Sequence, residues 1–279
     1  MFQEITPHVY DNQYKPIEPG ADSILLCYQG REVLAGKRGQ QIELPRFRNL
    51  EEHNQNIYED YTYLFTIDKE RYYLGNDVSL GEETEFTWEN IGIFRTAQPQ
   101  HLAFAEITGF QLHNWYQNHQ FCGRCGKPLR QDHKERMLYC ETCDIVEYPK
   151  ISPAVIVGIT KGDEILMSKY AGREYSNYAL LAGFAEIGEA IEETVSREVM
   201  EEVGLKVKNI TYYKSQPWPL SESLLLGFFA ELDGDDTITL DEEELAMAAW
   251  FKRDDMPMEP DNVSLTNEMM MYFKNGFQC

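Results

Sequence analysis

The sequence predicts an α/β protein in three parts: a mostly β domain with a linking helix at 1–119, a zinc ribbon at 120–149 and a layered α/β domain at 150–279. Three observations lead to this division. Short β-type runs bounded by turn residues fill the first part, and two cysteine pairs follow them. After the cysteines, strand patterns alternate with helical ones, which favours a layered α/β domain.

The N-terminal part contains runs rich in β-branched and aromatic residues, separated by Gly, Asn and Asp. The strands that these runs predict cover 23–28, 61–67, 71–75 and 85–94. From about Gln100 to His119, apolar residues recur every three or four positions, which predicts a helix that leads into the cysteine pairs.

The C-terminal part is expected to contain both element types. Its predicted strands cover 154–159, 164–169, 208–213 and 223–232, and its predicted helices cover about 189–203 and 264–275. This order is typical of helices packed on a sheet.

The charge balance limits the choice of partners. The formal charge of −22, from 47 acidic and 25 basic residues, repels phosphates and anionic lipids. A phosphate-handling site in such a protein would need bridging cations. The N-terminal residues show no targeting pattern, and no apolar run approaches the roughly 18 residues of a membrane span. We therefore expect a cytoplasmic protein with no membrane partner.

Four cysteines form two CxxC pairs separated by fourteen residues: Cys122 with Cys125, and Cys140 with Cys143. Two such pairs can converge on a tetrahedral Zn²⁺, and four thiolates leave no open coordination position. We therefore expect structural zinc, because a reducing compartment disfavours the alternative of a disulfide or redox pair.

The segment around and between the cysteine pairs is locally basic. It contains Arg124, Lys127, Arg130, Lys134 and Arg136. These residues could contact a ligand phosphate or an RNA body, or they could form an ordinary solvated surface.

Three glutamates are spaced along one face of the helix expected at 189–203. Glu198, Glu201 and Glu202 stand at i, i+3 and i+4, and Glu202 falls within the apolar arc of the helix. Carboxylates crowded in this way repel one another, and burying them is costly unless cations neutralise them. Mg²⁺ or Mn²⁺ would suit these oxygen ligands. A solvent-exposed Glu-rich helix is the alternative.

The surrounding pattern resembles the Nudix signature. Glu189 follows Gly183 after five intervening residues, and after seven more residues comes the run 197–205, Arg-Glu-Val-Met-Glu-Glu-Val-Gly-Leu. The resemblance implies a Nudix α/β/α sandwich. It also implies that Glu198, Glu201 and Glu202 are the catalytic, metal-binding carboxylates, that Arg197 orients them and pairs with Glu189, and that the carbonyl of Ala182 adds a metal ligand.

A second motif begins at Ser215 and reads Ser-Gln-Pro-Trp-Pro. Together with the cysteine pairs it resembles the NADH pyrophosphatase subfamily of Nudix hydrolases, although Leu220, Ser221 and Glu222 stand where that subfamily usually has a continuation of Phe-Pro. The resemblance implies substrate contacts from Gln216, Pro217, Trp218, Pro219, Leu220, Ser221, Glu222 and Ser223. Trp218 offers a flat surface for a nicotinamide ring, although a Trp between prolines is also common in a packed turn.

The same resemblance implies further roles. Glu244 corresponds to a downstream metal ligand, with Glu242 and Glu243 as neighbours that a one-residue shift would select instead. Residues expected to contact substrate are Glu135, Tyr148, Thr266 and Arg95. Members of the subfamily form homodimers, so we expect a homodimer here.

The expected activity is metal-dependent hydrolysis of the pyrophosphate bond of NADH or NAD, which gives nicotinamide mononucleotide and AMP. Removal of an NAD cap from RNA 5′ ends by the same site is the alternative, and a non-catalytic nucleotide sensor is a second one. The sequence leaves open the order of preference among NADH, NAD, ADP-ribose and capped RNA.

Overall fold

The computed structural model describes residues 1–172, 177–261 and 263–276, so the last three positions of the domain expected at 150–279 lie outside the described residues. The chain forms two compact units. One comprises Phe2–Lys150, and the other begins at Ile151 and includes Met1. Each unit has a hydrophobic core of its own. The division into three domains stays a prediction.

The first unit contains a sheet with the strand order β1-β5-β6-β2-β3-β4, and β7 pairs with β3. The strands are β1 (Tyr10–Asp11), β2 (Ile24–Gln29), β3 (Glu32–Arg38), β4 (Gln41–Glu43), β5 (Tyr61–Ile67), β6 (Glu70–Gly75) and β7 (Thr87–Asn90). The helical segments are α1 (Phe47–Leu50), η1 (Glu51–His53), η2 (Ile91–Arg95) and α2 (Gln100–Asn118). The strand expected at 85–94 is wrong in its second half, because the Asn90 side chain accepts a hydrogen bond from Gly92 N and starts the 3₁₀ turn η2.

The cysteine module belongs to this same unit. Its strands β8 (Arg130–Gln131), β9 (Leu138–Cys140) and β10 (Ile145–Glu147) form a three-stranded antiparallel sheet. Arg136 does not lie on the expected basic surface, because its guanidinium donates to the carbonyl of Leu64 and lies over the Tyr14 ring. The module is therefore fixed to the N-terminal sheet by side chains as well as by the chain itself.

The second unit is built on a six-stranded mixed sheet. Its order is β14-β15-β11-β12-β16, and β13 pairs with β11. The strands are β11 (Ser152–Lys161), β12 (Glu164–Tyr170), β13 (Leu181–Phe184), β14 (Val207–Trp218), β15 (Ser223–Leu232) and β16 (Leu245–Lys252). The helical segments are α3 (Ile191–Val203), η3 (Pro219–Ser221), η4 (Arg253–Asp255) and α4 (Leu265–Lys274).

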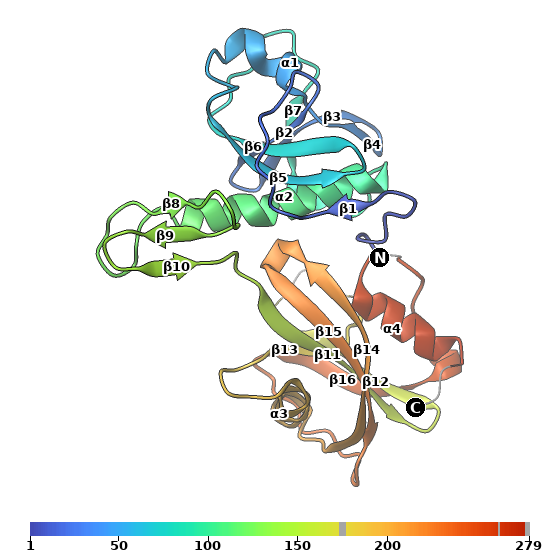
Figure 1. Cartoon of the computed structure of the whole chain (residues 1–279). Coiled ribbons are helices and arrows are strands. Elements are labelled where there is room, and N and C mark those ends of the chain that lie inside the picture. Colours follow the sequence, from blue (N-terminus) through green and yellow to red (C-terminus); the bar gives the residue numbers. More distant parts are fainter. Residues whose placement is uncertain (173–176, 262, 277–279) are drawn as a thin grey trace. The chain divides into compact units, whose positions relative to one another are not determined.

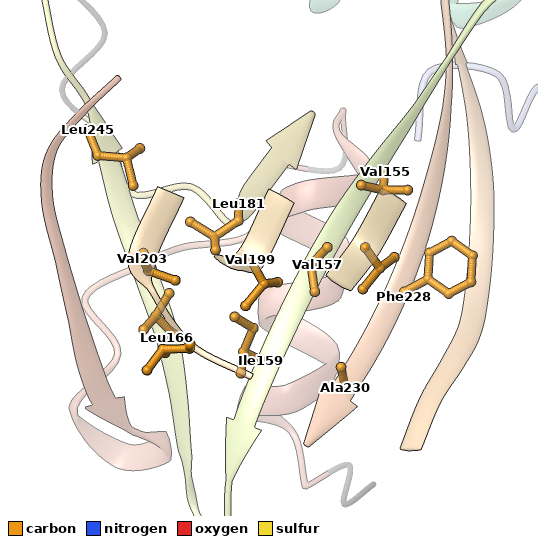
Figure 2. Packing of buried hydrophobic residues seen from close by; sticks show 12 residues of the cluster. Val155, Val157, Ile159, Leu166, Leu181, Val199, Val203, Phe228, Ala230 and Leu245 are labelled. Atoms are coloured by element: carbon orange, nitrogen blue, oxygen red, sulfur yellow. The ribbon is translucent and has the colours of Figure 1, made fainter. Parts of the chain in front are cut away.

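Helices α3 and α4 cover opposite faces of this sheet (Figure 1). Side chains alternate along β11, so Val157 packs with α3 while its neighbour Ile156 packs with α4. Figure 2 shows Val199 and Val203 of α3 inside the first of these two cores. The predicted α/β/α sandwich is therefore confirmed. Among the described residues, no helix has both the length and the apolar character needed to cross a membrane.

Candidate metal and substrate site

Helix α3 buries part of its glutamate face together with its valines. Glu202 is only 2% exposed and Glu198 9% exposed, because both lie beside the positions that pack on the sheet. Glu201 lies at the exposed edge of the same face. The i, i+3, i+4 spacing thus places two carboxylates inside the protein and one at its surface.

Gly183 provides the space for the Glu198 carboxylate. A Cβ atom at position 183 would lie 1.9 Å from Glu198 Cδ and within 2.2 Å of both carboxylate oxygens. Strand β13, which carries Gly183, is held in this position by pairing with Val155 of β11. A side chain at position 183 would therefore have to displace the Glu198 carboxylate from its place against the strand.

Arg197 connects the loop before α3 to the glutamates. Its Nε and Nη2 atoms donate to the two oxygens of Glu189 at 2.6 and 3.0 Å. Its Nη1 atom donates to Glu198 Oε1 at 2.7 Å and to Glu201 Oε2 at 2.8 Å, and Nη2 also reaches the carbonyl of Phe184 at 2.9 Å. The guanidinium lowers the pKa of Glu189 to about 2. The pair expected between Arg197 and Glu189 is thus present, and it is bidentate.

Glu202 is the least compensated carboxylate of the site. Neither of its oxygens has a hydrogen-bond partner of ordinary geometry among the described residues. Burial, and then the charges of Glu198 and Glu244, raise the pKa of Glu202 to about 8, against a smaller opposing effect of the Ala182 backbone. A buried acceptor without a partner costs free energy unless something else binds to it.

The structure also distinguishes Glu244 from Glu242 and Glu243, the three candidates for the downstream metal ligand. Glu244 acts electrostatically on both Glu198 and Glu202, whereas neither Glu242 nor Glu243 is among the groups that raise these two pKa values. The backbone N–H of Asp241 donates to the carbonyl of Glu202 at 2.9 Å, which ties this loop to the end of α3. This geometry favours Glu244, although its role as a metal ligand stays a prediction.

The carboxylates suit a divalent cation. They supply hard oxygen ligands, they repel one another, and within the described part of the chain the oxygens of Glu202 have no partner of ordinary geometry, so a divalent cation would remove an electrostatic cost that the folded chain carries alone. Arg197 occupies one oxygen each of Glu198 and Glu201.

The four cysteines converge much more closely. The sulfur atoms of Cys122, Cys125, Cys140 and Cys143 lie within 4.8 Å of one another. Each pair closes a tight turn, in which Gly126 N donates to the carbonyl of Cys122 at 2.8 Å and Asp144 N to that of Cys140 at 2.9 Å. Gly126 and Asp144 both have positive φ, as the turns require. Backbone N–H groups, that of Cys125 first, lower the pKa of Cys122 to about 7, which favours its thiolate, while hydrogen bonding with the other thiols, that of Cys125 first, raises the pKa of Cys143.

The Ser-Gln-Pro-Trp-Pro segment ends a strand. Residues 215–218 are the last of β14 and pair with residues 226–223 of β15, so the chain turns only at Pro219, the first residue of η3. Gln216 is fully buried. Trp218 is partly exposed where the strand ends, and Glu222, with φ of 55°, closes the turn back to Ser223.

The remaining predicted substrate residues lie in different parts of the fold. Tyr148 donates from its hydroxyl to Glu135 Oε2 at 3.0 Å, so the structure brings these two together in the first unit. Arg95, in the same unit, ends η2. Thr266 lies in the first turn of α4 in the second unit. The proposed contacts of these residues with substrate stay predictions.

Sequence reasoning missed one exposed aromatic residue at the site. Phe184 directly follows Gly183, its carbonyl accepts from Arg197, and it is 54% exposed. An aromatic residue at the surface beside buried carboxylates offers a stacking face to a ligand ring. Its position next to the first glycine of the signature was the available signal.

The fold and the site define an α/β/α domain with a carboxylate-lined helix, in a chain that also carries a four-cysteine module. Residues 150–272 match the NUDIX domain, and residues 117–148 match the NADH pyrophosphatase zinc ribbon domain. The NAD-capped RNA hydrolase NudC of Pseudomonas fluorescens (strain Pf0-1) is 38% identical over 206 residues, which cover 73% of this chain and 74% of that protein. The chain therefore belongs to the Nudix family, in the group with the NADH pyrophosphatase zinc ribbon, and the predicted resemblance is confirmed.

Two further matches cover less of the chain. The NAD-capped RNA hydrolase NudC of Pseudomonas entomophila (strain L48) is 44% identical over 160 residues, so the match spans 57% of this chain and 58% of that protein. A solved NUDIX hydrolase from Nitrosomonas europaea is 22% identical, has a TM-score of 0.48, and the match covers 56% of this chain and 92% of that one. With the ribbon match, the cysteine cluster is identified as a structural zinc site, as expected.

Proposed function

We propose that the protein hydrolyses the pyrophosphate bond of NADH and NAD and releases nicotinamide mononucleotide and AMP. One observation carries the proposal: Glu202 is buried beside Glu198 and Glu244, and among the residues that the structure describes neither of its oxygens has a hydrogen-bond partner of ordinary geometry. In a protein of net charge −22, such a cluster makes physical sense where divalent cations link carboxylates to the phosphates of a ligand.

The cations would be Mg²⁺ or Mn²⁺, held by Glu198, Glu201, Glu202, Glu244 and the carbonyl of Ala182. When bound, they supply neutralisation of phosphate charge and a lowered pKa for an attacking water. Glu202 is the carboxylate that we propose as essential, because it has the strongest electrostatic need for a partner. Arg197 holds Glu198 and Glu201 in orientation. Hydrolysis adds the water oxygen to one phosphorus and breaks the bond from that phosphorus to the bridging oxygen.

Trp218 would seat the nicotinamide half of the substrate. It is partly exposed at the end of a strand whose pairing with β15 continues to Ser223, so the ring is presented from a rigid position. The turn that follows, from Pro219 to Ser223, would add polar contacts, including those of Ser221 and Ser223, whose hydroxyl oxygens are 2.9 Å apart.

Hydrolysis of an NAD cap on RNA is the second candidate. The names of the NudC relatives favour it, and the bond that is cut is the same. The basic segment contributes less to RNA binding than its composition indicates, because Arg136 is directed into its own unit and Arg130 forms an ion pair with Glu141 at 2.9 Å.

We further propose that the protein works as a homodimer in the cytoplasm. The subfamily resemblance supports the dimer. The four free cysteines of the zinc cluster, which need to stay reduced, support the compartment.

The test compares NADH, NAD, ADP-ribose and NAD-capped RNA at equal concentration, with Mg²⁺ and with Mn²⁺, by chromatography of the products. Release of nicotinamide mononucleotide and AMP from the free dinucleotides supports the main proposal. Preference for capped RNA, with a rate that falls steeply with added salt, would favour the second candidate. Binding without turnover of any of the four substrates would identify a nucleotide sensor instead.

A further inference from the structure

Gln216 connects the strand of the substrate motif to the start of α4. Its side chain is 0% exposed. Its Nε2 atom donates to the carbonyl of Val263 at 2.9 Å, and its Oε1 atom accepts from the backbone N–H of Leu265 at 2.7 Å. Leu265 is the first residue of α4, and the first N–H groups of a helix have no partner within the helix. The amide therefore satisfies two backbone groups of a segment 47 and 49 residues further along the chain.

The same strand carries Trp218. From Lys214 to Trp218 the pairing of β14 with β15 is regular, so the side chains of Gln216 and Trp218 leave the same face of the sheet. Leu225, the cross-strand partner of Gln216, packs in the core that α4 covers. One face of the sheet thus carries Trp218 and the bound start of α4, which continues into Thr266.

We propose that Gln216 is a positioning residue that fixes the first turn of α4 relative to Trp218 and thereby sets the affinity for the nicotinamide half of the substrate. The inference rests on the proposed function. In it Gln216 does not contact the substrate directly, but acts on substrate binding through Leu265 and its neighbour Thr266. The physical basis is that both hydrogen-bonding atoms of a fully buried amide are already bound to backbone on the facing segment.

The test variant is Gln216→Met, which keeps the length of the side chain and removes both hydrogen bonds. The KM for NADH is expected to rise by about tenfold while kcat stays within about twofold, because the change displaces a binding surface and leaves the glutamates in place. ADP-ribose has the same pyrophosphate bond but no nicotinamide, so its KM should change by less than about threefold. If Gln216→Met does not fold, Gln216→Glu serves in its place: it keeps the acceptor for Leu265 N, loses the donor to Val263, and carries the same expectation.

The matched control acts on the other end of the same helix. Lys274 Nζ donates to the carbonyls of Met256 and Met258 at 3.0 and 3.1 Å, so Lys274→Met also removes two hydrogen bonds that hold α4. We expect it to lower stability without changing the KM for NADH. Hydrogen exchange measured by mass spectrometry should show faster exchange at 263–266 in Gln216→Met and not in Lys274→Met.

The readouts separate the possible failures. An equal rise of KM in both variants, or an equal rise for NADH and ADP-ribose, would overturn the positioning role, and so would an unchanged KM despite faster exchange at 263–266. If the wild-type protein cleaves neither dinucleotide, the proposed function fails. In that case unchanged exchange in Gln216→Met would also refute the anchoring, whereas faster exchange would support it independently of activity.

Discussion

Replacing Glu202 by glutamine tests two properties of this residue separately. One is the free energy that its buried carboxylate costs the folded chain, and the other is its role in catalysis. In the protein without Mg²⁺ or Mn²⁺, burial and the charges of Glu198 and Glu244 raise the pKa of Glu202 from 4.5 to about 8. A carboxyl whose pKa is higher in the folded than in the unfolded state binds its proton more tightly when folded. Its contribution to stability is therefore lost as the pH rises from about 4.5 to about 8.

The size of the effect follows from these values. At pH 7 the unfolded chain has ionised Glu202, whereas the folded protein still holds its proton. The difference between pH 7 and the ordinary pKa of 4.5 amounts to about 3 kcal/mol, at roughly 1.4 kcal/mol for each pH step. Glutamine carries no such cost, so Glu202→Gln should raise the free energy of unfolding by an amount of this order.

Urea unfolding from pH 5 to 9, with zinc retained and without Mg²⁺ or Mn²⁺, measures this difference. The gap between variant and wild type should widen with pH and level off near pH 8. Glu192→Gln, at an exposed position of the same helix, is the control and should change stability by less than about 0.5 kcal/mol. The variant should also lose NADH hydrolysis. A variant that is less stable than wild type at pH 8, or one that keeps its activity, would refute the reasoning.

Three other perturbations test separate parts of the structure. Gly183→Ala places a Cβ atom 1.9 Å from Glu198 Cδ, so we expect weaker Mn²⁺ binding by calorimetry and loss of turnover, and unchanged Mn²⁺ affinity would contradict the close approach. Arg197→Lys removes the bidentate contact with Glu189 and should lower Tm and Mn²⁺ affinity together, which a thermal scan with and without Mn²⁺ detects. Cys140→Ala removes a buried zinc ligand, so we expect the ribbon to unfold and to release one zinc per chain, which a chromogenic chelator detects. A ribbon that stays folded without zinc would argue against a structural role for the metal.

The sequence was most informative where periodicity and chemistry coincide. The position of Glu202 within the apolar arc of its helix predicted burial, and the side chain is buried. The alternation of β and helical patterns predicted a layered α/β domain, since apolar runs such as that of β11 form strands between two helical layers. Cysteine spacing predicted the convergence of four sulfur atoms, because short loops permit few other geometries.

Long-range contacts could not be read in the same way. Strand β16 follows an acidic run, and its position in the sheet depends on its pairing with β12. Local residue propensities do not predict such pairing. The strand expected at 85–94 ends early because the Asn90 side chain competes with the ladder for a backbone N–H group. The hydrogen bonds from Gln216 to the start of α4 could not be predicted, because its partners stand 47 and 49 residues away in the sequence.

The alternation along β11 restricts how this protein can vary. Consecutive residues of that strand belong to opposite layers, as Val157 and Ile156 show, so deleting or inserting a single residue there would exchange the two sets of side chains and damage both layers in one event. Insertions and deletions should therefore be tolerated at the turns that flank β11, such as the one at Gly162, and should be rare within the strand itself.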